Sequence, residues 1–222
     1  AHADPFSCAP YANATSHKAI GLGSVLSPYR LCTPAQLKSL GDASGDWTKV
    51  YALEADLDMY GITTFKPIGT TAKPFTGQLR GNGHQVYHLA IDLPATSYVG
   101  LFGNLRGSVT DLFLHADVTG SSYVGGLAGA ADAGAVISNV HASGGTIQGG
   151  GFAGSVGGLV GKLGSATITG SNTFGVTVVG GNSTGGLVGS AGTGASISAS
   201  YAQDTAVDGA YFTGGLAGLA SY

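Results

Sequence analysis

Short runs of alternating apolar and polar residues, separated by glycine, fill the second half of the chain. A Gly-Leu-x-Gly tetrad recurs there, and its leucines are 26, 32, 28 and 29 residues apart. Each of the first four tetrads is followed by one apolar-alternating segment and then by a second segment rich in β-branched residues. The anchor leucines are Leu101, Leu127, Leu159, Leu187 and Leu216. The pattern predicts an internal repeat of about 28 residues with three short strands in each unit.

Glycine-bounded segments of this length do not form rows of helices. Each glycine inside a helix costs about 1 kcal/mol relative to alanine, and no apolar period of 3.6 residues is present. A propeller blade needs about 40 residues or more, and leucine-rich and ankyrin repeats carry other signatures. The remaining architecture is an all-β, right-handed parallel β-helix of about seven coils. The apolar residues of each coil would turn inward and stack on those of the next coil.

The segment upstream of the tetrads predicts two irregular coils, at residues 48–97. Residues 53–59 alternate with period two, so Glu54, Asp56 and Asp58 would share one strand face. Neighbouring side chains on such a face are about 7 Å apart, so two carboxylates could share a Ca²⁺ ion. The competing interpretation is a solvated strand face. Calcium is the one cofactor that the sequence suggests.

Residues 28–47 predict a short capping helix at the amino end of the solenoid. Thr33 would be the N-cap, Pro34 the first helical residue and Gln36 the partner in a capping box, and Gly41 would end the helix. Residues 1–27 form a leader before it. The β-helix then covers residues 48–222, with the regular coils at 98–222 and the last coil incomplete. That last coil would leave an uncapped end.

Composition excludes several classes of protein. The chain has 40 glycines in 222 residues and only 9% charged residues, against a usual 25% or so. Global disorder needs low hydrophobicity and high charge, and collagen needs a strict glycine period of three. No apolar run approaches the ~18 residues of a membrane-spanning helix. A formal charge of −3 gives no electrostatic footprint for nucleic acid.

Both cysteines, Cys8 and Cys32, lie near the amino terminus. A disulfide between them would tether the leader and contribute roughly 3 kcal/mol in the chain-entropy model. Two free or buried thiols are the alternative. A disulfide would indicate an oxidising compartment, such as a periplasm or the cell exterior.

The tandem pattern Val-Gly-Gly-Leu-x-Gly followed by Ile-x-x-Ser-Tyr-Ala is clearest at residues 123–142 and 184–202. It resembles the GLUG-motif repeats of large bacterial surface proteins, which include filamentous-haemagglutinin-like adhesins and the leader regions of some immunoglobulin-A-cleaving metallopeptidases. The resemblance covers roughly residues 28–222 and implies a stalk or an adhesive surface with no assigned catalytic residue. The sequence departs from the pattern at Phe174-Gly175 and in the insert at residues 145–151.

Aligning the coils predicts two columns of side chains, which together form a candidate ligand face. The candidate face residues are Phe113, His141 and Tyr201 from one column, which also holds Asn172, and Tyr123 and Phe212 from the other. Exposed aromatic rings can stack on sugar rings or bury the apolar side chains of a partner. The competing interpretation is that they only cover the solenoid surface.

We therefore expect a non-catalytic, secreted or cell-surface bacterial adhesin or surface-fibre segment. Its partner would be a glycan or protein of a host or neighbouring cell, with no membrane insertion. One alternative is a fibre subunit that stacks on itself through the uncapped coil. Another is a carbohydrate-active or carbohydrate-binding β-helix protein, whose cleft on the early coils would be lined by Asp56, Asp58, Lys66 or Arg80.

Overall fold

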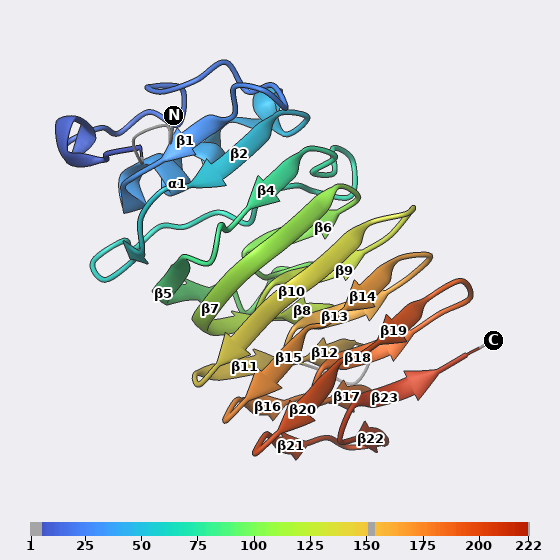
Figure 1. Cartoon of the computed structure of the whole chain (residues 1–222). Coiled ribbons are helices and arrows are strands. Elements are labelled where there is room, and N and C mark those ends of the chain that lie inside the picture. Colours follow the sequence, from blue (N-terminus) through green and yellow to red (C-terminus); the bar gives the residue numbers. More distant parts are fainter. Residues whose placement is uncertain (1–5, 151–153, 222) are drawn as a thin grey trace.

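The chain folds as a β-solenoid with one short α-helix at its amino end (Figure 1). The computed structural model describes residues 6–150 and 154–221. Successive coils stack in sequence order from the amino end to the carboxy end, and every paired strand runs parallel to its neighbour. This arrangement agrees with the predicted parallel β-helix.

The walls of the solenoid are three parallel sheets. Sheet A has 14 strands and its longest row is β1 (Tyr29–Leu31), β2 (Val50–Leu53), β4 (Gln78–Arg80), β7 (Ser108–Gly120), β10 (Val136–Ser143), β14 (Thr167–Thr169) and β19 (Ser196–Ser198). Its other strands are β3 (Leu57–Asp58), β5 (Gln85–Asp92), β11 (Thr146–Gly149), β15 (Asn172–Phe174), β16 (Thr177–Val179), β20 (Tyr201–Gln203) and β21 (Ala206–Asp208).

The other two sheets close the coils. Sheet B contains β6 (Phe102–Leu105), β9 (Ala128–Ala131), β13 (Val160–Leu163), β18 (Val188–Ala191) and β23 (Ala217–Ala220). Sheet C contains β8 (Val124–Gly125), β12 (Ser155–Gly157), β17 (Ser183–Gly185) and β22 (Phe212–Gly214). The predicted insert at 145–151 provides β11, and Gly151 lies outside the described residues.

A single interior column runs the length of sheet A. One residue from each of the seven strands in its longest row is in register with the next, and the column comprises Tyr29, Tyr51, Leu79, Val109, Ile137, Ile168 and Ile197. Seven strands separated by six steps give a solenoid of about six turns. Alternate residues of each strand face the interior, which is mainly apolar, although Thr173 and Thr184 are also fully buried there.

The amino end is covered by α1 (Pro34–Asp42). The Thr33 side chain accepts a hydrogen bond from the Gln36 N–H, and the Gln36 side chain accepts one from the Thr33 N–H, so the predicted capping box is present. The predicted end at Gly41 is wrong, since the helix continues to Asp42. Gly41 is required by packing instead: a Cβ there would lie 2.5 Å from the Lys66 carbonyl oxygen.

The leader packs against this cap. The disulfide between Cys8 and Cys32 is present, and a 3₁₀ turn, η1 (Ala9–Tyr11), follows Cys8. His17 is buried, with its ring nitrogens 2.9 Å from the Ser39 hydroxyl and 3.0 Å from an Asp46 carboxylate oxygen. Asp46 closes the second 3₁₀ turn, η2 (Ser44–Asp46). The first five residues of the predicted leader lie outside the described residues.

The anchor leucines occupy the corners between sheets C and B. Leu101, Leu127, Leu159 and Leu187 are fully buried, and the Leu159 N–H donates to the Leu187 carbonyl oxygen at 2.9 Å. Leu216 is 39% exposed, because no further described coil lies over it. The glycine before each leucine allows the corners to stack closely.

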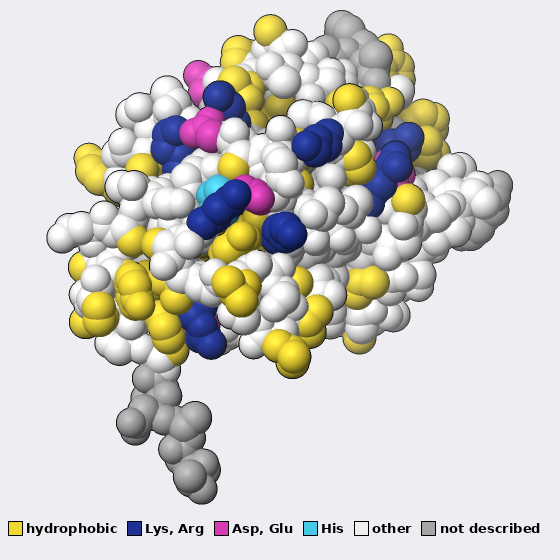
Figure 2. Space-filling view, turned by 90° about the horizontal axis from the view of Figure 1, so that it is seen from above, with side chains coloured by type: hydrophobic (Ala, Val, Ile, Leu, Met, Phe, Trp, Pro, Cys, Tyr) yellow, Lys and Arg dark blue, Asp and Glu magenta, His cyan; other side chains and the backbone are white. Residues whose placement is uncertain are grey.

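Charged side chains concentrate at the amino end. Figure 2 looks down on this end and shows Lys and Arg side chains spread over it, several of them beside Asp or Glu. Seven of the nine basic residues lie between Arg30 and Arg106. Within the described residues, no helix is both long and apolar enough to cross a membrane.

Candidate functional site

The first predicted column lies on the outer face of sheet A. His141 is in register with Phe113 on one side and with Asn172 on the other, and Asn172 is in register with Tyr201. We call these four residues the outer column. Phe113 is 46% exposed and Tyr201 is 52% exposed, and the Phe113 and His141 ring centroids are 5.0 Å apart. The repeat alignment therefore placed these residues correctly.

A polar network holds the middle of the outer column. Asp111 and Asn139 both adopt a left-handed backbone conformation, with φ near 55°, and the Asn139 amide donates to the Asp111 carboxylate at 2.8 Å. The Nε2 atom of His141 lies 2.7 Å from the Asn139 side-chain oxygen, and its Nδ1 atom contacts the Asn172 side chain. These contacts fix the orientation of the His141 ring against its neighbours.

The second predicted column lies on a different sheet. Phe212 is in register with Ser183 in sheet C and is 51% exposed. Tyr123 precedes β8 in the same sheet, stacks on Tyr98 with centroids 4.8 Å apart, and has the Lys162 ammonium 5.7 Å from its ring. The structure therefore separates Tyr123 and Phe212 from the outer column, and the five candidate residues form two surfaces.

The three candidate cation ligands do not converge. The chain leaves β2 after Leu53 and re-enters the sheet at β3, so residues 54–56 form a break rather than one continuous strand. Each carboxylate pairs with a basic side chain of its own: Glu54 with Arg30 at 2.6 Å, Asp56 with His84 at 3.1 Å, and Asp58 with His88 at 2.9 Å. Nowhere in the described residues do three or more His, Cys, Asp or Glu side chains group so as to hold a metal ion.

These pairings also set the protonation of the aspartates. A hydrogen bond from His88, together with one from the Tyr60 N–H, lowers the pKa of Asp58. Burial raises the pKa of Asp56, but hydrogen bonds from the Gln85 N–H and from His84 outweigh burial, so this pKa is lowered as well. Both carboxylates are therefore ionised at neutral pH, and each already has a basic partner.

The residues of the proposed enzymatic cleft are dispersed. Asp56 and Asp58 have the histidine partners described above, whereas the Lys66 ammonium pairs with Asp42 at 2.9 Å. The Arg80 guanidinium, at the end of β4, donates to the carbonyl oxygen of Val25 in the leader at 3.3 Å. General acid–base catalysis needs groups within hydrogen-bond reach of one substrate atom, and these four side chains do not meet in one cleft.

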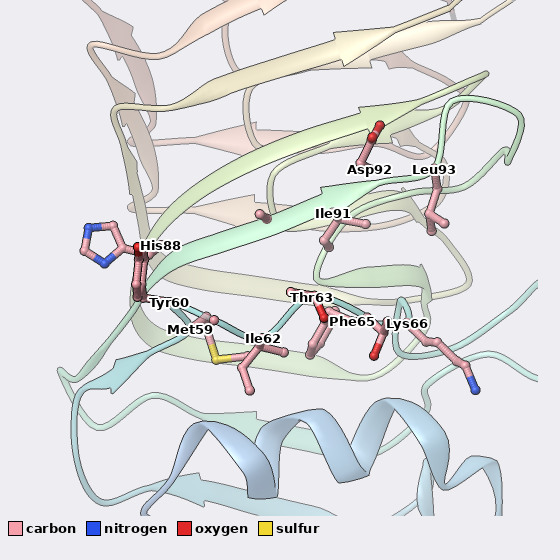
Figure 3. A pocket seen from close by; sticks show the side chains of 13 residues that line it. Met59, Tyr60, Ile62, Thr63, Phe65, Lys66, His88, Ile91, Asp92 and Leu93 are labelled. Carbon is pink, nitrogen blue, oxygen red and sulfur yellow. The ribbon is translucent and has the colours of Figure 1, made fainter.

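A groove in the side of the early coils was not predicted from the sequence. It has a volume of about 660 Å³ and lies between residues 59–66 and residues 88–93, which are the second half of β5 and Leu93 after it. Figure 3 shows Tyr60 and His88 at one end of it and Lys66 at the other. We call it the side groove. Its lining is mainly apolar, with Ile62 and Leu93 partly exposed.

Comparisons with known proteins bear on the repeats. The GLUG motif family matches residues 120–148. Halomucin from Haloquadratum walsbyi is 36% identical over 192 residues, or 80% of this chain. A protein from Evansella cellulosilytica, provisionally named a Gly-rich membrane protein, is 32% identical over 104 residues, or 44% of this chain. The chain spans only 2% and 12% of the lengths of these two relatives.

A solved structure has the same fold. It comes from Bacteroides ovatus and is provisionally named an immunoglobulin A1 protease; its TM-score is 0.77 at 22% identity, over 98% of this chain and 69% of that one. At this level of identity the likeness is one of fold alone.

Proposed function

Because this chain belongs to the GLUG-motif repeat proteins, we propose that it is a non-catalytic segment of an extracellular bacterial surface protein, an adhesin or surface fibre. The names of its relatives, halomucin and a Gly-rich membrane protein, support a place at the cell surface. The segment would present sheet A to a glycan or protein on a host or neighbouring cell.

The observation that carries this proposal is the outer column. Phe113 and Tyr201, at its two ends, leave about half of their surface in water, and Phe174, two residues after Asn172 in β15, is 48% exposed. Exposed rings on a rigid sheet are typical of binding surfaces, because a ring face stacks on a sugar ring or covers an apolar side chain. The flat outer face of a solenoid also suits a long ligand.

The repeats suit an exposed exterior segment. After Arg106 the chain carries a single basic residue, Lys162, so proteases that cleave at Lys and Arg have little to act on there. The hydrogen bonds between coils and the polar network at His141 keep the outer column in place without a ligand. Such preorganisation reduces the entropy lost on binding.

A glycan array probed with the purified, fluorescently labelled chain tests the proposal, with binding to intact bacterial and epithelial cells as a second readout. The double variant Phe113→Ser, Tyr201→Ser should weaken binding at least about tenfold, since each exposed ring contributes 1 kcal/mol or more to such contacts. Leu26→Ser is the matched control, because Leu26 is an exposed apolar residue of the leader, remote in sequence from the outer column.

Two results would contradict the proposal. One is the absence of binding to any glycan or cell by the unmodified chain. The other is binding that the double variant and the Leu26→Ser control reduce equally. Circular dichroism of both variants shows whether the solenoid is intact, as expected for substitutions at exposed positions.

A further inference from the structure

The strand β5 has an unpaired edge. On one side β5 pairs with β7 at both of its ends, through Gln85 and Val86 and again from Leu89 to Asp92, with a shift of register between Val86 and Leu89. On the side that faces the cap it pairs only with β3, and only through Val86 and Tyr87. Beyond Tyr87, no described strand continues the sheet on that side.

The backbone groups of this free edge point into the side groove. The Leu93 N–H donates to the Thr119 carbonyl oxygen of β7 at 2.9 Å, so this peptide group faces β7. Successive residues of a strand direct their N–H and C=O groups to opposite sides. Ala90 and Asp92 therefore direct theirs away from β7, and both residues line the side groove and are exposed.

The opposite wall of the groove also lacks strand pairing. After Met59, whose N–H donates to the Tyr87 carbonyl oxygen at 2.8 Å, the chain leaves the sheet. Thr63, Thr64 and Phe65 form no strand, and their backbone groups make no hydrogen bond within the described residues. The groove thus occupies the place of a missing strand, between two stretches of backbone.

The row of paired strands that ends at β5 continues through all the later coils, and we call this row, β5, β7, β11, β16 and β21, the ladder. Ile91 is in register with Val118, which is followed in the next coils by Ile147, Val178 and Val207. Each of these strands lies between or beside others of the same ladder. At Ile91 the ladder stops, and the apolar floor of the groove takes the place of the next strand.

We propose that the side groove binds an extended peptide segment of a partner protein, which adds to the sheet as a strand along β5. Donors and acceptors that alternate at β spacing are matched by a peptide backbone, and neither a sugar nor an acyl chain supplies that pattern. From Ala90 to Leu93 the edge accommodates about four residues, or about 13 Å. One inward-facing apolar side chain of the peptide would enter the cavity beside Ile62 and Leu93.

This site is separate from the outer column. It lies on an early coil, and its occupant is defined by backbone hydrogen bonds rather than by aromatic stacking. The inference goes beyond the proposed function, and a failure of one leaves the other intact.

The probe is a fluorescein-labelled peptide, Val-Thr-Val-Val-Gly, which copies residues 176–180. This segment contains β16, which occupies the same ladder two coils further on than β7. The fluorescence anisotropy of this peptide, titrated with the whole chain, should show saturable binding with a Kd below about 1 mM.

Ala90→Pro removes one N–H from the free edge while leaving the bonds to β7, so it should weaken binding at least about tenfold. Ala90→Ser, which keeps the N–H, should bind like the unmodified chain.

Hydrogen exchange supplies a measurement that needs no variant. The amides of Ala90 and Asp92 should exchange more slowly when the probe is present, and a peptide N-methylated at alternate residues should give no such protection. The inference is overturned if the probe does not bind, if Ala90→Pro binds it as well as Ala90→Ser, or if these amides gain no protection. A dimer that dissociates on Ala90→Pro would assign the groove to a second copy and also overturn the inference.

Discussion

The amino-terminal part, residues 6–106, and the repeat part, residues 108–221, are stabilised by different means. The first contains the disulfide, the α-helix and all seven ion pairs of the described residues, which fall between His17 and His88. It also contains a cluster of packed rings, in which Phe75 and Phe102 have centroids 4.9 Å apart. In the repeat part, none of the described residues forms an ion pair, and hydrogen bonds between coils connect successive strands.

The difference shows that the repeating coils and the end of a solenoid need different kinds of stabilising contact. A repeating coil needs the same small shape at each corner, so glycine and alanine recur and large side chains are restricted. The end of the stack has no such neighbour and must cover an open edge, so it uses specific side-chain contacts. Loss of a named side-chain contact should therefore harm mainly the amino-terminal part, whereas the repeat part should be most sensitive to an added Cβ at a corner glycine.

The largest effect is expected from a single methyl group at a repeat corner. In Gly186→Ala the new Cβ would lie 2.0 Å from the Gly215 carbonyl oxygen and 2.9 Å from the Ala202 Cβ, and backbone cannot yield as a side chain can. We expect a loss of about 4 kcal/mol in the free energy of unfolding, measured by urea denaturation.

Gly215→Ala is the matched control, at the same position of the next coil. No described atom lies within 4 Å of its new Cβ, so we expect a change of about 0.5 kcal/mol or less. Equal destabilisation by the two substitutions would show that glycine is needed here for chain flexibility and not for the close contact between coils.

A smaller effect is expected from removal of the disulfide. The bond joins residues 24 positions apart, and replacing Cys8 and Cys32 by serine should lower the free energy of unfolding by about 3 kcal/mol, because the unfolded chain gains freedom. Hydrogen exchange should show the loss in the leader and cap, with the repeat coils unchanged.

The unmodified chain, reduced with dithiothreitol, is the control for this variant. It should have the same urea midpoint as the double serine variant. Faster exchange spread evenly over the repeat coils would mean that the cap and the repeats unfold as one unit, which would remove the distinction drawn between them.

The smallest effect is expected from acid. In the folded chain the pKa values of Asp42, Asp46, Asp56 and Asp58 lie below the ordinary 3.8. A hydrogen bond from a basic side chain is the main cause at Asp42 and Asp58, whereas at Asp46 and Asp56 burial acts in the opposite direction and is outweighed. Groups whose pKa is lowered by folding contribute stability above the unfolded pKa and lose it as pH falls through the folded pKa.

The amino-terminal part should therefore lose stability below about pH 3.8, and the repeat part should change less. Hydrogen exchange at pH 5 and at pH 3, corrected for the intrinsic rates, measures both parts in one sample. Asp46→Asn should reduce the acid sensitivity of the cap, since it removes one of the four titrating groups. A loss of protection confined to the repeat coils would contradict the prediction.

The repeats were predictable because their pattern is redundant. Each coil repeats the Gly-Leu-x-Gly corner and the inward-facing apolar residue of its neighbours. An alignment of the sequence alone therefore placed His141 beside Phe113 and Asn172. The capping box was also predictable, because Thr33 and Gln36 act within one turn of helix. Local or repeated signals of this kind need no knowledge of distant contacts.

Where contacts are distant and occur once, the sequence was a poorer guide. Glycine is common at helix ends, which is why Gly41 was predicted to end the helix. Its role is instead to leave room for the Lys66 backbone, which approaches it only in the folded chain. The alternation at residues 53–59 predicted one strand, and the sheet is interrupted there. The side groove left no signal either, because it depends on a strand that is missing between Met59 and β5.

The interior column of sheet A runs along the solenoid axis, and the hydrogen bonds between coils point in the same direction. A force that pulls the two ends apart therefore loads these bonds in line and opens them a few at a time. Coil lengths of 28, 31 and 29 residues between Val109, Ile137, Ile168 and Ile197 mean that each coil pulled free releases about 100 Å of chain. Under tension such a segment would lengthen in steps, and the coils not yet opened would keep their fold.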